Sequence, residues 1–406
     1  MARRKSKIIK TKKNVHIICA LFYFIVLVFF ISLLVAALVH QPVLSFAKKN
    51  HFYDNPEARK LQRVPVPVMG GFVVFMGAMA GSLCYWFKHD CHSIVLVQIA
   101  MLLMLIIGAW DDIKKLSPLL RFVFEILIVI ALAVGNNYPV NDLHGLWGVH
   151  EISPWIAWPL TVFGCIGIIN AINMIDGIDG LSSGICIMAF GFYGILFFYS
   201  HDFVRTALAA SIIGGLIPFF IMNVFGNRSK MFIGDAGTMM LGIALCDMVM
   251  AMLTKDSACA RQTEETNFCL IAYALAVLAI PVFDTVRVMF GRISRGESPF
   301  YPDKTHLHHA FIDYGFHHLE TSLMEIMLNM MIIGVWWVFY KSHFSEQWQL
   351  YGVVVASIGV CYGLYWMLGR RKRIAQKVKE MYGISMEEYE ALTDEERKKL
   401  KKIDKR

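Results

Sequence analysis

The chain has 406 residues, of which 57% are apolar and 17% are charged, and its formal net charge is +8. Its mean hydropathy is +0.53. A soluble protein of this length seldom has so apolar a composition, so these values exclude an ordinary soluble enzyme. They predict an all-α, polytopic integral membrane protein.

Apolar stretches with roughly the ~20 residues that a bilayer-spanning helix needs recur along the sequence. They predict about eleven transmembrane helices, near residues 16–39, 66–87, 94–110, 121–137, 155–170, 184–199, 207–225, 237–253, 268–290, 323–340 and 348–368. Four stretches are short or interrupted, by Glu125, Pro159, Pro218 and Asp247 respectively. The predicted parts are a basic N-terminal tail (1–15), a membrane domain (16–368) and a charged cytoplasmic tail (369–406).

The positions of Lys and Arg indicate the orientation, because these residues favour the cytoplasmic side. They gather in the odd-numbered loops and at the start of the C-terminal tail, which reads RRKR at 370–373. With eleven helices these segments share one side, which we expect to be cytoplasmic. The basic N-terminal tail then lies on the opposite side; we follow the loops, because downstream segments can override the first helix.

The first loop contains the block DNPEARK at 54–60. Its Arg59 and Lys60 suit an anionic ligand, and an arginine can bind phosphate through two hydrogen bonds. We therefore expect substrate binding in this loop. Basic residues that merely anchor a helix end at the cytoplasmic surface are the alternative.

The third predicted helix ends in GAWDDIKKLSP at 108–118, with Asp111 and Asp112 side by side. Carboxylates are poorly placed at a helix C-terminus, where the helix dipole favours cations. The pair is suited to binding a divalent cation or taking up a proton. The alternative is an ordinary cap of the next helix.

The stretch NAINMIDGIDGLSSG at 170–184 lies between apolar segments and holds four polar side chains. Residues three apart share a helix face, so Asn173, Asp176 and Asp179 are expected to point the same way, with Asn170 extending the row. Carboxylates at membrane depth are costly and mark function by default. The alternative is a turn rich in Asn, Asp and Gly between two helices.

The seventh loop ends in MFIGDAG at 231–237, where Asp235 follows a glycine at a helix start, near Asn223. Backbone N–H groups and a carboxylate in one place can hold a Mg²⁺–phosphate complex. A simple Asp cap is the alternative. Asp247, deeper in the helix, has no clear partner and is left outside the site.

The ninth loop carries SPFYPDKTHLHH at 298–309, with Asp303, His306, His308 and His309. The histidines are too close in sequence to form a tetrahedral zinc site alone, but their rings can donate hydrogen bonds to phosphate oxygens. A solvated histidine-rich loop is the alternative. Since all these clusters occupy odd-numbered loops, they meet at one membrane face and together predict a site for a Mg²⁺-bound diphosphate.

In this order, over residues 40–320, the blocks resemble those of the polyprenyl-phosphate N-acetylhexosamine-1-phosphate transferases. The matching blocks are DNPEARK, the DD pair, NAINMIDGIDGL, MFIGDAG and SPFYPDKTHLHH. The ninth loop is more similar to members that start O-antigen, enterobacterial common antigen or teichoic acid than to the peptidoglycan translocase. Gln62 departs from the His that many members have after the Arg-Lys pair, which puts a role for that position in doubt.

The resemblance implies transfer of a sugar 1-phosphate, with GlcNAc expected, from a UDP-N-acetylhexosamine to undecaprenyl phosphate, releasing UMP. This reaction would initiate a cell-envelope polysaccharide at the cytoplasmic face of the bacterial cytoplasmic membrane. Two mechanisms stay open: direct attack of the lipid phosphate on the nucleotide sugar, and transfer through a covalent aspartyl intermediate. We expect the protein to contact membrane lipids and not to bind nucleic acid. A homodimer is possible.

The resemblance also assigns roles to residues. It implies catalysis by Asp111, Asp112 and Asp235, and a Mg²⁺ or Mn²⁺ cofactor held by Asp235 and Asp176. The side chains expected to bind substrate are Arg59, Lys60, Asn170, Asn173, Asp176, Asp179, Asn223, Asp303, His306, His308 and His309.

Two other classes of protein share single features with this sequence. Intramembrane carboxylates also mark ion-coupled carriers, but those often have paired repeats and place the acids near mid-membrane, whereas here the acids gather at one face. A CDP-alcohol phosphotransferase would carry an Asp-Gly-x-x-Ala-Arg block, which this sequence lacks.

Overall fold

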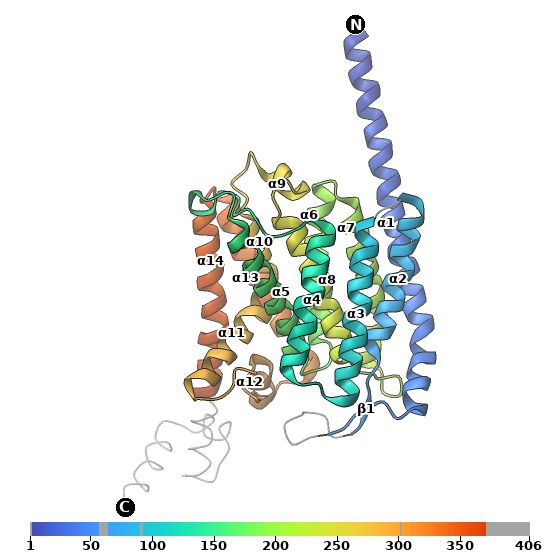
Figure 1. Cartoon of the computed structure of the whole chain (residues 1–406), viewed down its shortest axis with the longest axis vertical. Coiled ribbons are helices and arrows are strands. Elements are labelled where there is room, and N and C mark those ends of the chain that lie inside the picture. The colour runs from blue at the N-terminus through green and yellow to red at the C-terminus, as the bar shows by residue number, and fades with distance from the viewer. Residues whose placement is uncertain (1, 57–63, 90–91, 301–302, 371–406) are drawn as a thin grey trace, which may run out of the picture.

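The computed structural model describes residues 2–56, 64–89, 92–300 and 303–370, and it is a bundle of long helices (Figure 1). Ten helices of the described part are long and apolar enough to cross a membrane. They are α1 (Ala2–Lys49), α2 (Gly70–His89), α3 (His92–Lys114), α4 (Pro118–Asn136), α5 (Pro154–Met174), α6 (Leu181–Tyr199), α7 (Phe203–Phe225), α8 (Gly234–Leu253), α13 (His318–Lys341) and α14 (Glu346–Ile358), which a π-helix (Gly359–Leu364) continues. The predicted all-α, multi-pass membrane fold is confirmed.

The ninth predicted span is bent, although the sequence suggested one straight helix at 268–290. It consists of α10 (Leu270–Val277) and α11 (Ala279–Ser294), which meet at 75°. Pro281 has no N–H to donate to the carbonyl four residues earlier, so the helix ladder breaks there. The side chain of Asn329, in α13, replaces the lost bonds: Nδ2 donates to the Val277 carbonyl at 3.0 Å, and Oδ1 accepts the Ile280 N–H at 2.9 Å.

The four interruptions seen in the sequence leave their helices intact. Pro159 lies inside α5 and Pro218 inside α7. Glu125 and Asp247 are buried within α4 and α8, where neighbouring helices supply their partners. The two acidic interruptions therefore indicated buried contacts, whereas the true break lies between α10 and α11, just before Pro281.

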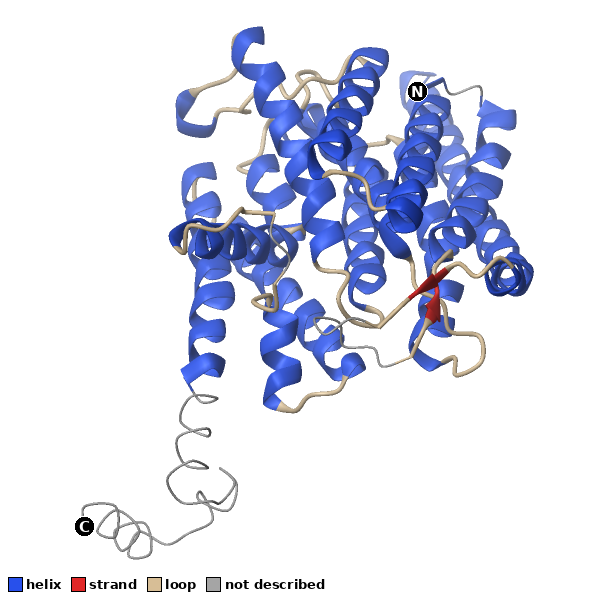
Figure 2. Ribbon diagram, turned by 60° about the horizontal axis from the view of Figure 1, so that its bottom comes forward, coloured by secondary structure: helices blue, strands red, loops and turns tan. Residues whose placement is uncertain are grey.

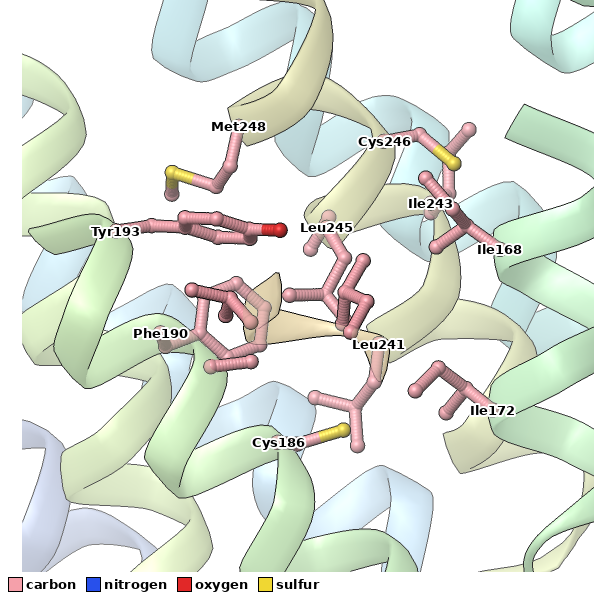
Figure 3. Close-up of a cluster of buried hydrophobic side chains, with 14 of the residues drawn as sticks. Ile168, Ile172, Cys186, Phe190, Tyr193, Leu241, Ile243, Leu245, Cys246 and Met248 are labelled. Atoms are coloured by element: carbon pink, nitrogen blue, oxygen red, sulfur yellow. The ribbon is translucent and has the colours of Figure 1, made fainter. Parts of the chain in front are cut away.

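Helix α8 forms the centre of the bundle, and most of its side chains are buried. Figure 3 shows its middle, where Leu241, Leu245 and Met248 pack between side chains of α5 and α6. A buried apolar helix of this kind holds its own N-terminus at a fixed place relative to all its neighbours. That N-terminus carries Asp235.

The predicted motifs meet at one end of the bundle. There β1 (Tyr53–Asp54) pairs antiparallel with β2 (Val66–Pro67), and α12 (Leu307–Tyr314) lies at the same end (Figures 1 and 2). Val68, directly after β2, forms a parallel β-bridge with Phe232, so α2 and α8 begin side by side. The opposite end holds α9 (Ala258–Thr263) and the start of α1 (Figure 1).

Candidate functional site

A cavity of about 590 Å³ lies at the end of the bundle that holds β1, β2 and α12. Eleven of the predicted site residues line it, namely Asp112, Asn170, Asn173, Asp176, Asp179, Asn223, Asp235, Asp303, His306, His308 and His309. Asp111 is not among the lining residues, and Arg59 and Lys60 lie outside the described residues. The structure therefore brings residues of four motifs, together with Asn223, from positions 112 to 309 of the sequence into one cavity.

Asp235 and Asp112 are neighbours in the lining of the cavity. The Asp235 carboxylate accepts a hydrogen bond from Asn173 Nδ2 at 2.8 Å. Asp112, at the end of α3, accepts the backbone N–H groups of Asp235 and Ala236 at 3.0 and 3.2 Å. The first N–H groups of a helix have no partner inside it, so a carboxylate there is favourable. The cap of α8 thus comes from another helix, which the sequence could not reveal.

Asp111 faces away from the cavity, because successive residues of a helix point in different directions. Its Oδ1 accepts the Leu116 N–H at 2.7 Å, and its Oδ2 lies 3.4 Å from Arg121 Nη1. Neither carboxylate of the pair caps α4, whose cap is Ser117. Of the two adjacent acids, only Asp112 lines the cavity.

Asn170 is occupied by neighbours that the sequence analysis did not include. Its Nδ2 donates to the buried Glu125 at 2.8 Å, and its Oδ1 accepts from Arg121 Nη2 at 2.8 Å. Arg121 itself lines the cavity. Asn170, Glu125 and Asp111 therefore hold one arginine at the cavity. Asn170 also lines the cavity, and its predicted contact with substrate stays a prediction.

The turn between α5 and α6 places two carboxylates differently from the expected helical row, because α5 ends at Met174. Asp176 accepts from Ser182 Oγ at 2.5 Å. Burial raises the pKa of Asp176 to about 7, and the nearby negative charge of Asp235 adds to the effect. This carboxyl group is therefore ready to take up a cation or a proton.

Asp179 is already paired. Its Oδ2 lies 2.6 Å from Lys230 Nζ and 3.0 Å from His318 Nδ1. Burial alone would raise the pKa of Asp179, but the hydrogen bonds and charges of His318 and Lys230 outweigh it and lower the pKa below its ordinary value. Asp179 thus orients a lysine and a histidine at the cavity, both of which the sequence analysis missed as site residues.

Asn223 and Asp303 support the loops of the site. Asn223 Oδ1 accepts the Gly180 N–H at 2.8 Å, and its Nδ2 donates to the Met231 carbonyl at 3.0 Å, so it ties two motifs together. Asp303 lies 2.9 Å from Arg292 and 3.0 Å from Arg295. Burial alone would raise the pKa of Asp303. The hydrogen bonds from Arg292 and Thr305 outweigh burial, so the pKa lies below its ordinary value. Both side chains line the cavity while they hold its walls.

His306, His308 and His309 all line the cavity, and their rings pack against one another. His308 packs against Gly177, where a Cβ would lie only 2.2 Å from the His308 Nε2 atom, so a glycine is required for this close approach. Burial and neighbouring histidines hold the pKa of His308 well below its usual value, and burial lowers the pKa of His309 to about 4. Both rings are therefore neutral near pH 7.

A metal site is only partly built by the described side chains. None of their His, Cys, Asp and Glu groups forms a set of three or more arranged to hold a metal ion. Mg²⁺ on a substrate diphosphate needs only one or two carboxylates, since phosphate oxygens and water complete its shell. Asp235 Oδ1 is bonded to Asn173, no described residue bonds to Oδ2, and Asp176 is near enough to sense the charge of Asp235. The residues thus fit a metal that arrives with its substrate.

Comparison with known proteins agrees with this geometry. Residues 94–253, which run from α3 to the end of α8, match the sequence profile of glycosyl transferase family 4. A Haemophilus influenzae protein named undecaprenyl-phosphate alpha-N-acetylglucosaminyl 1-phosphate transferase is 30% identical over 338 residues, covering 80% of this chain and 92% of that protein.

Proteins with the same name from other bacteria give similar matches. The Salmonella typhi protein is 26% identical over 336 residues, covering 80% of this chain and 88% of its own length. The Escherichia coli K12 protein is 26% identical over 347 residues, covering 83% and 91%. The chain therefore belongs to glycosyl transferase family 4, among the polyprenyl-phosphate N-acetylhexosamine-1-phosphate transferases.

Proposed function

We propose that this protein transfers N-acetylglucosamine 1-phosphate from UDP-N-acetylglucosamine to undecaprenyl phosphate. The products are undecaprenyl-pyrophosphate-N-acetylglucosamine and UMP. One observation carries the proposal: three carboxylates, Asp112, Asp176 and Asp235, meet histidines and Arg121 in one cavity at the end of a membrane bundle. The names of the relatives supply the acceptor lipid and the sugar.

The position of the cavity suits two substrates of opposite character. A nucleotide sugar is soluble, whereas undecaprenyl phosphate stays in the bilayer and offers only its phosphate at the surface. A cavity at the end of the bundle can take one from water and the other from the membrane. We place this end at the cytoplasmic side of the bacterial cytoplasmic membrane, on the Lys and Arg distribution of the loops.

Phosphoryl transfer depends mainly on positioning and on neutralising charge. Asp235, with Asp176 beside it, would hold Mg²⁺ or Mn²⁺, which neutralises the diphosphate when bound. Arg121 and Lys230 supply further positive charge around the phosphates. Asn173 orients Asp235 through its 2.8 Å bond, and Asp112 fixes the start of α8 on which Asp235 sits.

The reaction is proposed as the step that starts a cell-envelope polysaccharide, because the lipid-linked sugar phosphate is a primer to which further sugars can be added.

The test is transfer by the purified protein in lipid vesicles that contain undecaprenyl phosphate. A panel of radiolabelled UDP-N-acetylhexosamines would be supplied with Mg²⁺, with Mn²⁺ or with EDTA. We expect label in the organic phase from UDP-GlcNAc, one UMP released per label transferred, and no transfer with EDTA. A folded protein that transfers nothing from any donor would contradict the proposal, and transfer from a different UDP-sugar would correct the named donor.

A further inference from the structure

A buried aspartate on α11 is bonded to one of the site histidines. Asp284 Oδ2 lies 2.8 Å from His306 Nδ1, and both side chains are almost fully buried. The two residues are 22 positions apart, with Asp284 inside α11 and His306 directly before α12. Asp284 does not line the cavity, whereas His306 does.

The other contacts of Asp284 determine its protonation. Its Oδ1 accepts from Arg287 Nη2 at 2.6 Å and from Arg287 Nε at 3.2 Å. The backbone N–H of Leu307 donates to the same carboxylate at 3.2 Å. Every partner of Asp284 other than His306 can only donate, so the carboxylate is ionised and accepts from all of them.

The tautomer of His306 follows from this arrangement. Because the ionised carboxylate can only accept, Nδ1 of His306 must carry the proton. In the neutral ring the proton is then absent from Nε2, which has a free lone pair. No described residue bonds to Nε2, and the ring stacks on His308 with centroids 5.5 Å apart and planes 10° apart. The structure thus presents a proton acceptor to the cavity.

Several contacts keep Asp284 in place. The break between α10 and α11, bridged by Asn329, turns α11 by 75°, and α11 carries both Asp284 and the cavity-lining Arg292. Arg287 also donates to the Thr305 carbonyl at 2.5 Å, and its guanidinium lies 3.8 Å from the centre of the Tyr365 ring. Arg287 therefore links Asp284 to the loop before α12 and to the last membrane span.

We propose that Asp284 is a positioning residue. It fixes His306 in the tautomer whose Nε2 atom accepts the proton of the lipid phosphate. This inference rests on the proposed transferase function. The lipid phosphate monoanion gives its proton to Nε2, and the freed oxygen attacks the sugar-bearing phosphorus of the nucleotide sugar. The bond from that phosphorus to the UMP oxygen breaks, and UMP leaves with the electron pair. Asp284 keeps its charge and stabilises the imidazolium that forms.

Asp284→Asn tests the tautomer without changing the shape of the side chain. Arg287 and Leu307 still need an acceptor, so the amide oxygen of Asn stays at the Oδ1 position and the NH₂ group faces His306. The NH₂ group can only donate, so Nδ1 must become an acceptor and the proton moves to Nε2. The acceptor in the cavity is thereby replaced by a donor, as in tautomer-changing variants of other carboxylate–histidine pairs.

The kinetic experiment compares wild type with Asp284→Asn, His306→Gln and the double variant. We expect each single variant to lose about 10²–10⁴-fold in kcat with KM changed less than about threefold. The double variant should be no slower than the slower single variant, because Asp284 acts through His306. Independent costs that multiply would mean a separate structural role and would overturn the inference, as would near-normal turnover of Asp284→Asn.

Glu325→Gln is the matched control, since Glu325 is also a buried carboxylate near α11 but does not line the cavity. Its kcat should stay within about threefold of wild type, and its unfolding midpoint shows how much a buried neutral amide disturbs this region. If Glu325→Gln lowers kcat as much as Asp284→Asn does, the inference about the histidine fails.

A second readout does not depend on activity. The protein has 14 histidines, and ¹⁵N-histidine NMR spectra of the wild type and His306→Gln in membranes identify the His306 signals by difference. We expect a proton on Nδ1 in the wild type and on Nε2 in Asp284→Asn; an unchanged tautomer would overturn the inference. A wild type without transferase activity would contradict the proposed function instead, and the tautomer would still be measured.

Discussion

Two groups of buried acids lie at opposite ends of this bundle. Asp112, Asp176 and Asp235 line the cavity, and no described arginine or lysine forms an ion pair with any of them. Asp202 and Asp247, near the other end, share Arg205, whose Nη1 lies 2.6 Å from Asp202 and whose Nε lies 3.7 Å from Asp247. The first group has no cationic partner among the described residues and is open to a ligand, whereas the second is paired with an arginine within the protein.

The second group is built as a structural contact. Asn136 Nδ2 donates to Asp247 at 3.3 Å, and the guanidinium of Arg205 lies 4.7 Å from the Tyr138 ring centre. The group joins the end of α4, the start of α7 and the middle of α8. We infer that acids without a counter-charge in the described protein, such as those of the first group, are available to a ligand, whereas Asp202 and Asp247 stabilise the fold.

Breaking the paired group should give the largest loss of stability. Arg205→Leu leaves two buried carboxylates without their cation, and we expect ~3–5 kcal/mol of destabilisation. Asp235→Asn, which removes an unpaired acid, should not lower the unfolding midpoint. Thermal unfolding of both variants in the same detergent measures the difference, and equal losses would remove the distinction between the two groups.

The close contact between the two central motifs gives the next effect. Gly177→Ala places a methyl group 2.2 Å from the buried His308 ring, so the ring or the turn must move. We expect ~1–3 kcal/mol of destabilisation and a loss of transfer activity. Gly167→Ala, in α5, is the control, because a Cβ there meets no atom within 4 Å. Equal behaviour of the two variants would show that His308 does not need this approach.

The raised pKa of Asp176 predicts a pH-dependent effect in the same range or smaller. The folded pKa of about 7 exceeds the ordinary value of 3.8, so the folded state favours the protonated acid. This contribution is complete below about pH 4 and is lost as the pH rises toward 7. Asp176→Asn should therefore stabilise the protein at pH 8 and have little effect near pH 4. We expect only ~1–2 kcal/mol at pH 8, because water in the cavity reduces the cost of the ionised carboxylate. Unfolding midpoints that change equally at both pH values would contradict the raised pKa.

The pair of Lys230 with Asp179 should contribute least to stability. Lys230 is 31% exposed, so solvent screens the pair, and Asp179 keeps its bond to His318 when the lysine is lost. Lys230→Met should cost at most ~1 kcal/mol. If Lys230 also binds substrate phosphate, KM for the donor should rise while kcat changes less. A large stability loss with unchanged KM would make the lysine purely structural.

The sequence predicted the fold and the membership of the site better than the roles within it. Apolar lengths located every span, because a helix in a bilayer must satisfy its own backbone. The bend at Pro281 was missed, since it depends on Asn329, 48 positions later, filling the broken ladder. A local pattern could not show this long-range replacement.

The same limit applies to the site. The motifs identified residues that meet, but which carboxylate oxygen is free depends on partners from other helices. Asp111 and Asn170, for which roles at the substrate were predicted, are both bonded to Arg121, a partner that their motifs did not indicate. Asp247 seemed to have no partner in the sequence, because Arg205 lies on a different helix. Only the folded arrangement distinguishes a paired acid from a free one.

The most direct test measures lipid-linked sugar formed by Asp235→Asn and Asp247→Asn side by side, per amount of folded protein. Our account predicts that Asp235→Asn loses transfer by about 10²–10⁴-fold while it keeps the wild-type unfolding midpoint. It predicts that Asp247→Asn unfolds at a lower temperature and transfers at nearly the wild-type rate. Near-normal transfer by Asp235→Asn, or loss of transfer by well-folded Asp247→Asn, would contradict the account.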